Sequence, residues 1–294
     1  MTFKDLNLAP LLLKALDEAN YSLPTPIQEN AIPFILNRND LIGCAQTGTG
    51  KTASYVLPIL QLLSGEKSSS TDVHALIVAP TRELVLQISD NIKLYSKYLD
   101  MKHVTLIGGE SVPKQVNRLR TKPRIIVATP GRLLDLVQQK ELTLRSIKYL
   151  VLDEADQMLD MGFLKDIQRI LKLIPESRQT LLFSATMPDS IKKFALSIQK
   201  NPKEVIISKV SSTAQTVKQS VYMTNMNDKK DLLQHVFTST NNEKCIVFVK
   251  TKYGADKLVK FLAKSGFKAV AIHGNKSQNA RVKALGDFKD NSVK

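Results

Sequence analysis

The sequence has few cysteines and no long apolar segment. Its two cysteines, Cys44 and Cys245, lie in separate apolar, strand-like runs. A disulfide framework is therefore not expected, and this cysteine content fits a reducing cytosol. No apolar run approaches the roughly 18 residues of a membrane-spanning helix. The N-terminus also lacks the basic start, apolar core and small-residue cleavage site of a signal peptide. We expect a cytoplasmic protein without a membrane partner.

Acidic residues are scarce relative to basic ones. The 294 residues include 27 Asp and Glu against 42 Lys and Arg, which gives a net charge of +15. Most of this excess lies in residues 208–294. A strongly basic chain favours a polyanionic partner, although charge alone does not separate nucleic acid from an anionic membrane. A lysine-rich surface that only keeps the protein soluble would give the same count.

Short apolar runs alternate with amphipathic stretches through most of the chain. Each run is rich in Ile, Val and Leu, as expected of a buried strand, and the stretches between them have helical spacing. This alternation predicts an α/β fold in which helices cover both faces of a parallel sheet. The predicted strands are Asp40–Cys44, Ala75–Ala79, Val104–Ile107, Ile125–Ala128, Tyr149–Asp153 and Thr180–Ser184. The clearest predicted helices are Arg82–Leu99, Gly131–Gln139 and Phe163–Ile174.

A polar stretch at 208–219 separates a second series of this kind and is predicted to be a linker. It divides the chain into domains at 1–207 and 220–294. In the second domain we expect strands at Ser220–Met223, Lys244–Val249 and Ala269–Ile272. Helices are expected from Lys229, at Tyr253–Ser265 and at Gln278–Phe288. These are few strands for a complete domain, so we expect the second domain to be partial.

The segment A-Q-T-G-T-G-K-T follows the first predicted strand and opens a helix. Its backbone N–H groups and the helix N-terminus form a cradle for phosphate oxygens. Lys51 is expected to reach the β- and γ-phosphates, and the Thr52 hydroxyl to bind magnesium. The generic pattern has glycine six residues before the lysine, where this chain has alanine, and a plain glycine-rich turn is the alternative. The predicted nucleotide contacts are Ala45, Gln46, Thr47, Gly48, Thr49, Gly50, Lys51 and Thr52.

Two carboxylates, Asp153 and Glu154, end the apolar run that begins at Tyr149. A carboxylate at the C-terminal end of a central parallel strand faces the crevice where ligands bind in open α/β sheets. Asp153 is suited to hold Mg²⁺, and Glu154 to activate the attacking water as a general base. The alternative is that the acidic residues only cap the next helix. With Lys51, they predict a site that hydrolyses a nucleoside triphosphate.

Taken together, these segments resemble the DEAD-box RNA helicases of superfamily 2, in which alanine is common at position 45. The resemblance covers almost the whole chain and implies a RecA-like domain followed by a partial second RecA-like domain. Pro24–Gln28 resembles the adenine-recognising Q motif. The Gln28 amide can pair with a donor and an acceptor on adenine, and Tyr21 could stack on the base. ATP and Mg²⁺ are the implied cofactors.

The resemblance also implies an RNA-binding face. Segments that resemble motif Ia, the GG element and motif Ib each follow a predicted strand, and hydroxyls, helix N-termini and Arg suit sequence-independent phosphate contacts. RNA is thus the expected partner, bound with low sequence specificity by a monomer. The predicted contacts are Pro80, Thr81, Arg82, Gly108, Gly109, Thr129, Pro130, Gly131 and Arg132.

Two further groups of residues match the family's order. Ser184, Ala185 and Thr186 resemble motif III, which links ATP hydrolysis to strand separation, and Asp156 is expected to bridge to it. Alternatively, these residues only cap the next helix. In the second domain, Ile246–Val249 resembles motif IV. The segment from Phe3 to Gln28 and the residue sequence of the phosphate loop, A-Q-T-G-T-G-K-T, resemble the bacterial RhlE-like subgroup.

One departure concerns motifs V and VI, which the family carries after this point and which this chain lacks. Motif VI supplies arginines to the γ-phosphate, and such a finger can contribute about 10³–10⁵ in rate. We therefore expect an ATP-dependent RNA helicase, with weak hydrolysis and unwinding by this chain alone. The alternatives are an ATP- and RNA-binding fragment that does not unwind, and a DNA-directed superfamily 2 helicase.

Overall fold

The computed structural model describes residues 1–66, 72–207, 218–239 and 244–293. It divides into two compact units, residues 1–212 and 213–294. The division falls in a stretch outside the described residues, and most of the predicted linker at 208–219 lies there too. Cys44 and Cys245 are free thiols in different units. Across the described ranges, no helix has both the length and the apolar character needed to cross a bilayer.

The first unit is built on one parallel sheet, with the strand order β3-β4-β2-β5-β6-β1-β7. Neighbouring strands are parallel throughout. The six strands predicted here are confirmed to within one residue at either end. The strands are β1 (Leu41–Cys44), β2 (Ala75–Val78), β3 (His103–Leu106), β4 (Ile125–Ala128), β5 (Tyr149–Leu152), β6 (Gln179–Ser184) and β7 (Lys203–Ile206).

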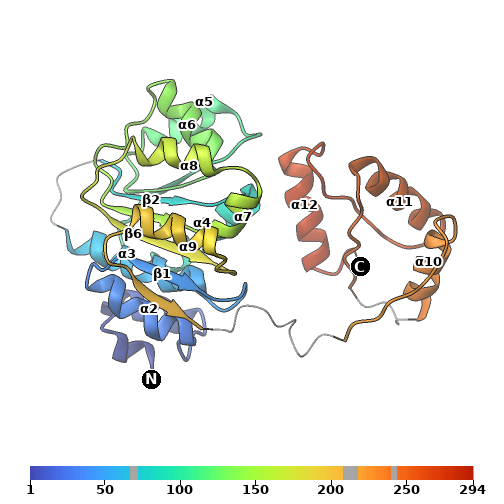
Figure 1. Ribbon diagram of the computed structural model, residues 1–294, viewed down its shortest axis with the longest axis horizontal. Helices are drawn as coiled ribbons and strands as arrows, with labels where there is room; N and C mark the ends of the chain where they lie inside the picture. The colour runs from blue at the N-terminus through green and yellow to red at the C-terminus, as the bar shows by residue number, and fades with distance from the viewer. Residues whose placement is uncertain (67–71, 208–217, 240–243, 294) are drawn as a thin grey trace. The chain divides into compact units, whose positions relative to one another are not determined.

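Helices connect the strands and pack on the sheet (Figure 1). The three helices predicted in this unit are confirmed, and each ends earlier than the sequence pattern indicated; α6 begins one residue earlier than predicted and α8 one residue later. The helices are η1 (Phe3–Leu6), α1 (Pro10–Glu18), α2 (Pro26–Leu36), α3 (Lys51–Gly65), α4 (Arg82–Tyr95), α5 (Val112–Leu119), α6 (Pro130–Gln138), α7 (Ala155–Asp160), α8 (Leu164–Leu171) and α9 (Asp189–Ile198).

Two hydrophobic cores lie on opposite faces of the sheet, because side chains alternate along a strand. In β5, Tyr149 and Val151 join the core formed with η1 and α1–α4. The intervening Leu150 and Leu152 join the core formed with α6–α9. Figure 1 shows α8 and α9 in front of the strands. The prediction of a parallel sheet with helices on both faces is confirmed.

Strand β7 was not expected from the sequence. It pairs only with β1 and forms an edge of the sheet, and Val205 is its only buried side chain. An edge strand with three exposed residues has no apolar run for a periodicity argument to detect.

The second unit contains the three predicted helices but not the three predicted strands. The helices are α10 (Lys229–Ser239), α11 (Lys252–Lys264) and α12 (Gln278–Lys289). The segments Ser220–Met223, Lys244–Val249 and Ala269–Ile272 form no strand in the described part of this unit, so that prediction is wrong. A strand requires a neighbour that exchanges backbone hydrogen bonds with it, and these segments are not joined in a ladder.

Apolar side chains in two of the three segments predicted as strands are largely exposed, unlike those of a strand buried in a sheet. Val221 is 88% exposed, and Met223 and Phe248 are each 93% exposed. In the first unit, by contrast, each apolar run except the edge strand is covered by helices. The buried contacts of the second unit are smaller: Leu262 is 3% exposed, and the rings of Phe237 and Phe267 lie 5.6 Å apart.

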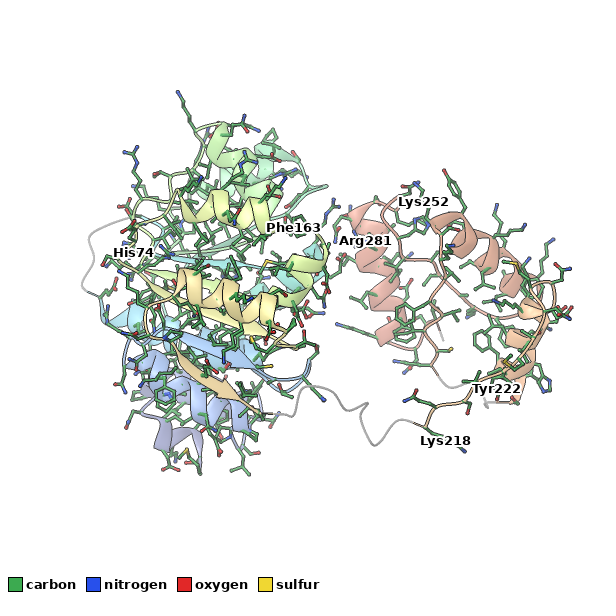
Figure 2. The ribbon with its side chains drawn as sticks, viewed as in Figure 1. His74, Phe163, Lys218, Tyr222, Lys252 and Arg281 are labelled. Carbon is green, nitrogen blue, oxygen red and sulfur yellow. The ribbon has the colours of Figure 1, made fainter. Side chains whose placement is uncertain are left out.

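A charged cluster ties the amino ends of three strands to the end of α3. Glu66 accepts hydrogen bonds from Lys148 at 2.9 Å, Arg124 at 3.2 Å and Tyr149 at 3.2 Å, and its carboxylate lies 3.3 Å from His74. Figure 2 shows His74 at this end of the unit. Burial alone would raise the pKa of Glu66, but the donors and cations around it lower the pKa below its ordinary 4.5.

This cluster predicts an acid-sensitive contribution to stability. Because the folded-state pKa of Glu66 is lowered, its contribution is complete above about pH 4.5 and is lost as the pH falls through the folded-state value. Glu66→Gln should therefore lower the free energy of unfolding by about 2 kcal/mol at pH 7. The difference from the unmodified protein should shrink below pH 4.5. Urea unfolding followed by circular dichroism at both pH values measures this.

Glu141→Gln is the matched control, because Glu141 is exposed. It should leave the unfolding curve nearly unchanged at both pH values. Equal stability of Glu66→Gln and the unmodified protein at pH 7 would contradict the role given to the cluster.

Candidate functional site

The sheet order brings three predicted segments to one edge. Strand β6 lies between β1 and β5, and all three are parallel, so their carboxyl ends are neighbours. The loop after β1, the acidic pair after β5 and residues 184–186 after β6 therefore lie together. Ala45 N–H donates to the Ser184 carbonyl at 3.1 Å, which joins the first and third segments directly. Ligands of open α/β sheets bind at such carboxyl ends.

The glycine-rich loop has the backbone that its sequence requires. Gly48 and Gly50 have φ values of 84° and 92°, a region that favours glycine. Gln46, Thr47 and Gly48 are exposed, so the top of the loop is open to a ligand. The Thr49 hydroxyl closes the loop by donating to the Gln46 carbonyl at 2.7 Å. Because α3 begins directly after Gly50, the N–H groups of its first turn and the positive end of its dipole face the opening of the glycine-rich loop.

Lys51 is held inside this loop. Its side chain is 7% exposed, and Nζ donates to the Ala45 carbonyl at 2.8 Å. An ammonium has three N–H donors, so this bond leaves it able to bind phosphate oxygens as well. Its positive charge partly offsets the effect of burial on the pKa of Asp153 and Glu154, which places these groups within electrostatic reach of Lys51.

The Asp153 carboxylate is fixed by two donors. Oδ2 accepts from the Tyr55 hydroxyl at 2.8 Å, and Oδ1 accepts from Glu154 N–H at 2.9 Å. Burial raises the pKa of Asp153, while these bonds and Lys51 lower it. Burial and the Asp153 charge in turn raise the pKa of Tyr55. The carboxylate predicted to bind magnesium is thus held at both of its oxygens.

Glu154 lies half-buried at the start of α7. Its backbone is left-handed, with φ of 53°, a conformation that costs a non-glycine residue about 1–2 kcal/mol. Burial raises the pKa of its carboxyl, and the negative charges of Asp153 and Asp156 raise it further. A carboxylate with a raised pKa is a better proton acceptor near neutral pH.

Asp156 connects α7 to the segment after β6. Its Oδ2 accepts from Thr186 N–H at 2.9 Å and from the Thr186 hydroxyl at 2.8 Å, while its own N–H donates to Ser184 Oγ at 3.3 Å. Burial would raise the pKa of Asp156, but the bonds from Thr186 and Ser184 lower it. Ala185 joins this network because its carbonyl accepts from Cys44 Sγ at 3.7 Å.

Gln28 lies directly against the glycine-rich loop. It is 2% exposed, its Oε1 accepts from Thr25 N–H at 3.0 Å, and its Nε2 donates to the Gly50 carbonyl at 3.1 Å. A Cβ atom at Gly50 would meet Nε2 at 2.3 Å, so Gly50 is required for this approach. Tyr21 is half-buried, with its hydroxyl 3.0 Å from that of Tyr95.

The residues predicted to bind RNA occupy the other half of the same edge. Strands β3, β4 and β2 are adjacent, and one predicted segment follows each of them. Arg82 packs over the glycine pair, since a Cβ atom at Gly109 would meet its Nη1 at 2.2 Å. Arg132 is mostly buried and donates to the Glu110 carbonyl at 3.0 Å. Gly109 and Gly131 are exposed.

The remaining members of this group help to shape the segments. The Thr81 hydroxyl caps α4 by accepting from Leu84 N–H at 3.2 Å, and Thr129 N–H donates to the Leu106 carbonyl at 3.0 Å. Pro80 and Pro130 are buried, while Gly108 is partly buried. Thus the side chains hold the loops, and the exposed backbone is left to meet a ligand.

Sequence reasoning missed two residues that hold the site. Gln115 of α5 is fully buried and bonds both the N–H and the carbonyl of Ile107, which supports the turn at Gly108. Tyr55 supports Asp153, as described above. Neither has a sequence signal, because both lie within helices where their spacing is that of core residues.

Two family models match this sequence. The DEAD/DEAH box helicase model matches residues 25–194, and the Helicase conserved C-terminal domain model matches residues 228–294. The DEAD-box ATP-dependent RNA helicase CshA of Streptococcus pneumoniae is 42% identical over the whole chain, which spans 55% of that protein. RhpA of Helicobacter pylori is 42% identical over 99% of the chain, which spans 58% of that protein. The chain thus spans little more than half the length of these relatives.

Solved structures of DEAD-box proteins resemble this chain over its whole length. Dbp5 of S. cerevisiae, bound to RNA and ADP BeF3, has a TM-score of 0.88 and 31% identity, covering 100% of this chain and 74% of that one. A DEAD box protein from Methanococcus jannaschii has a TM-score of 0.67 and 36% identity, covering 100% and 78% of the two chains. The predicted RecA-like α/β fold is therefore confirmed, and the chain belongs to the DEAD/DEAH box helicase family.

Proposed function

We propose that this chain binds ATP with Mg²⁺ and the backbone of RNA, and that it couples ATP hydrolysis to local unwinding of short RNA duplexes. The observation that carries the proposal is the meeting of Lys51, Asp153 and Glu154 at the carboxyl ends of β1 and β5, on either side of β6. Family membership supports ATP use, and the relatives named above are RNA helicases.

The side chains present suit magnesium held jointly with a triphosphate. Among the described residues, no cluster of three or more His, Cys, Asp and Glu could hold a metal ion by itself. Mg²⁺ is commonly bound by one or two protein oxygens together with phosphate oxygens and water. Thr52 in the first turn of α3 and Asp153 directly after β5 offer such a pair. The metal would neutralise charge on the β- and γ-phosphates.

Each remaining group at this edge has a proposed task. The loop backbone and Lys51 hold the phosphates, and Glu154 orients and deprotonates the attacking water. Gln28, which is bonded to Gly50, and Tyr21 select adenine. The bonds between Asp156 and Thr186 link this site to the segment Ser184–Thr186, which relays the nucleotide state.

RNA is proposed to lie across the carboxyl ends of β3, β4 and β2. Exposed backbone at Gly109 and Gly131 and the start of α6 offer N–H groups to phosphates, which gives little sequence specificity. We further propose a RecA-like domain at 1–207, a linker at 208–219, a partial second domain at 220–294, a monomeric state and a cytoplasmic location. The RhlE-like subgroup stays a prediction.

The first test concerns the general base. Glu154→Gln keeps the shape of the side chain but removes its basicity. RNA-stimulated ATP turnover should fall about 10²–10⁴-fold, while ATP binding, measured with a fluorescent analogue, should change little. Asp160→Asn removes an exposed carboxylate from the end of the same helix and serves as the control. Unchanged turnover in Glu154→Gln would remove Glu154 from the mechanism.

The unmodified chain also separates the alternatives. Binding of ATP and RNA without RNA-stimulated phosphate release would favour an ATP- and RNA-binding fragment. Equal stimulation by DNA of the same base sequence would favour a DNA-directed helicase, since RNA is distinguished by its 2′-hydroxyl groups.

The second test concerns the RNA face. A Cβ atom at Gly131 has open space around it, and the residue lies in the first turn of α6, where Asp is favourable to the helix. Gly131→Asp should therefore fold normally but place a negative charge against the RNA phosphates. Its affinity for a labelled single-stranded RNA should fall about tenfold at low salt, whatever the base sequence. Fluorescence anisotropy measures this.

Gly131→Ala adds only a methyl group and is the matched neutral control. It should bind RNA about as well as the unmodified chain. If Gly131→Asp binds RNA with unchanged affinity, the proposed path across β4 is wrong, while the nucleotide site is unaffected by that result.

A further inference from the structure

Tyr55 is a buried polar side chain for which the family resemblance gave no role. It lies in the second turn of α3, and its side chain is fully buried. Its ring packs against Phe183 of β6, with ring centroids 5.2 Å apart. Phe183 itself stands over Gly43, where a Cβ atom would meet its ring at 2.5 Å. Rigid elements on two sides therefore fix the position of the Tyr55 ring.

The hydroxyl of this ring contacts a side chain of the proposed nucleotide site. It donates to Asp153 Oδ2 at 2.8 Å, and Thr52 lies three positions before Tyr55 in α3, so that both are on one side of that helix. The second oxygen of Asp153 accepts from Glu154 N–H at 2.9 Å. With both oxygens bonded, the carboxylate is not free to rotate.

We propose that Tyr55 is a positioning residue for magnesium: its hydroxyl holds the Asp153 carboxylate in the orientation in which that carboxylate, together with Thr52, faces one Mg²⁺. The inference rests on the proposed function, in which ATP binds here together with the metal. Partners that orient metal ligands commonly contribute 10–100-fold to metal affinity. A site whose ligands are already oriented pays less conformational entropy on binding.

A purely structural role is the competing explanation. The Tyr55 hydroxyl also satisfies a buried carboxylate, which stabilises the folded state whether or not a metal binds. Loss of the hydroxyl would then lower the melting temperature and leave the response to magnesium unchanged. Measuring stability alone does not separate the two roles, so the test must measure the magnesium requirement.

The test uses Tyr55→Phe, which keeps the ring and removes only the hydroxyl. Binding of methylanthraniloyl-ATP to the full chain is followed by fluorescence, without magnesium and then across a MgCl₂ titration. Tyr55→Phe should need about 10–100-fold more Mg²⁺ for half of the magnesium-dependent change. Its affinity for the nucleotide without magnesium should stay within about twofold of the unmodified chain, because the loop and Lys51 are intact.

Tyr149→Phe is the matched control. It also removes one hydroxyl from a buried tyrosine, but that hydroxyl bonds to Glu66 at the opposite ends of the strands. It should leave the magnesium requirement unchanged. A Tyr55→Phe requirement within about twofold of the unmodified chain would overturn the inference. Absence of any magnesium effect on the unmodified chain would instead overturn the proposed function.

A second measurement keeps the test independent of how well Tyr55→Phe folds. 3-Fluorotyrosine placed at position 55 retains the hydroxyl and reports on it by ¹⁹F NMR. Adding Mg²⁺ to the nucleotide-bound protein should shift the signal from position 55, while the same label at position 149 should give no shift. No shift at position 55 would also overturn the inference.

Discussion

The hydrogen-bonded ladder that places β6 between β1 and β5 determines where every group of the nucleotide site lies. Cys44 pairs with Ser184 on one side of β6, and Leu152 pairs with Leu182 on the other. Adjacent strands are about 4.8 Å apart, so the ends of β1 and β5 lie about 10 Å apart. That distance suits a triphosphate with its metal. The loops contribute little to this spacing, since the strands that set it are buried on both faces.

Three carboxylates at the same edge of the sheet, Asp153, Glu154 and Asp156, have different surroundings. Asp156 accepts two bonds from Thr186 and donates its N–H to Ser184 Oγ. Its pKa is lowered, so its carboxylate remains ionised and serves as an acceptor. The pKa of Glu154 is raised by burial and by the negative charges of Asp153 and Asp156. Asp153 is buried but held by Tyr55. The three carboxylates thus have different surroundings, which suit the different tasks proposed for them: joining two elements, accepting a proton and meeting a cation.

Much of the first unit could be predicted from the sequence because its central strands are apolar runs that helices cover on both sides. Strand β7 could not, since one buried residue at an edge leaves no periodic signal. In the second unit, the apolar runs at Ser220–Met223 and Lys244–Val249 looked like strands, yet pairing depends on distant neighbours that a local pattern does not contain. The glycine-rich loop and the acidic pair Asp153 and Glu154 could be identified from the sequence because each directly follows an apolar run. Tyr55 could not, because its contact with Asp153 spans 98 positions and exists only after packing.

The left-handed backbone of Glu154 has an evolutionary consequence. Glycine or asparagine adopts that conformation more easily, so either substitution would relax the turn into α7 and add to the stability of the fold. Random mutation combined with a demand for stability alone would therefore drift away from glutamate at this position. The role proposed for Glu154 in accepting a proton is what would oppose that drift, because backbone strain of this kind belongs to positions where function rather than folding decides the residue.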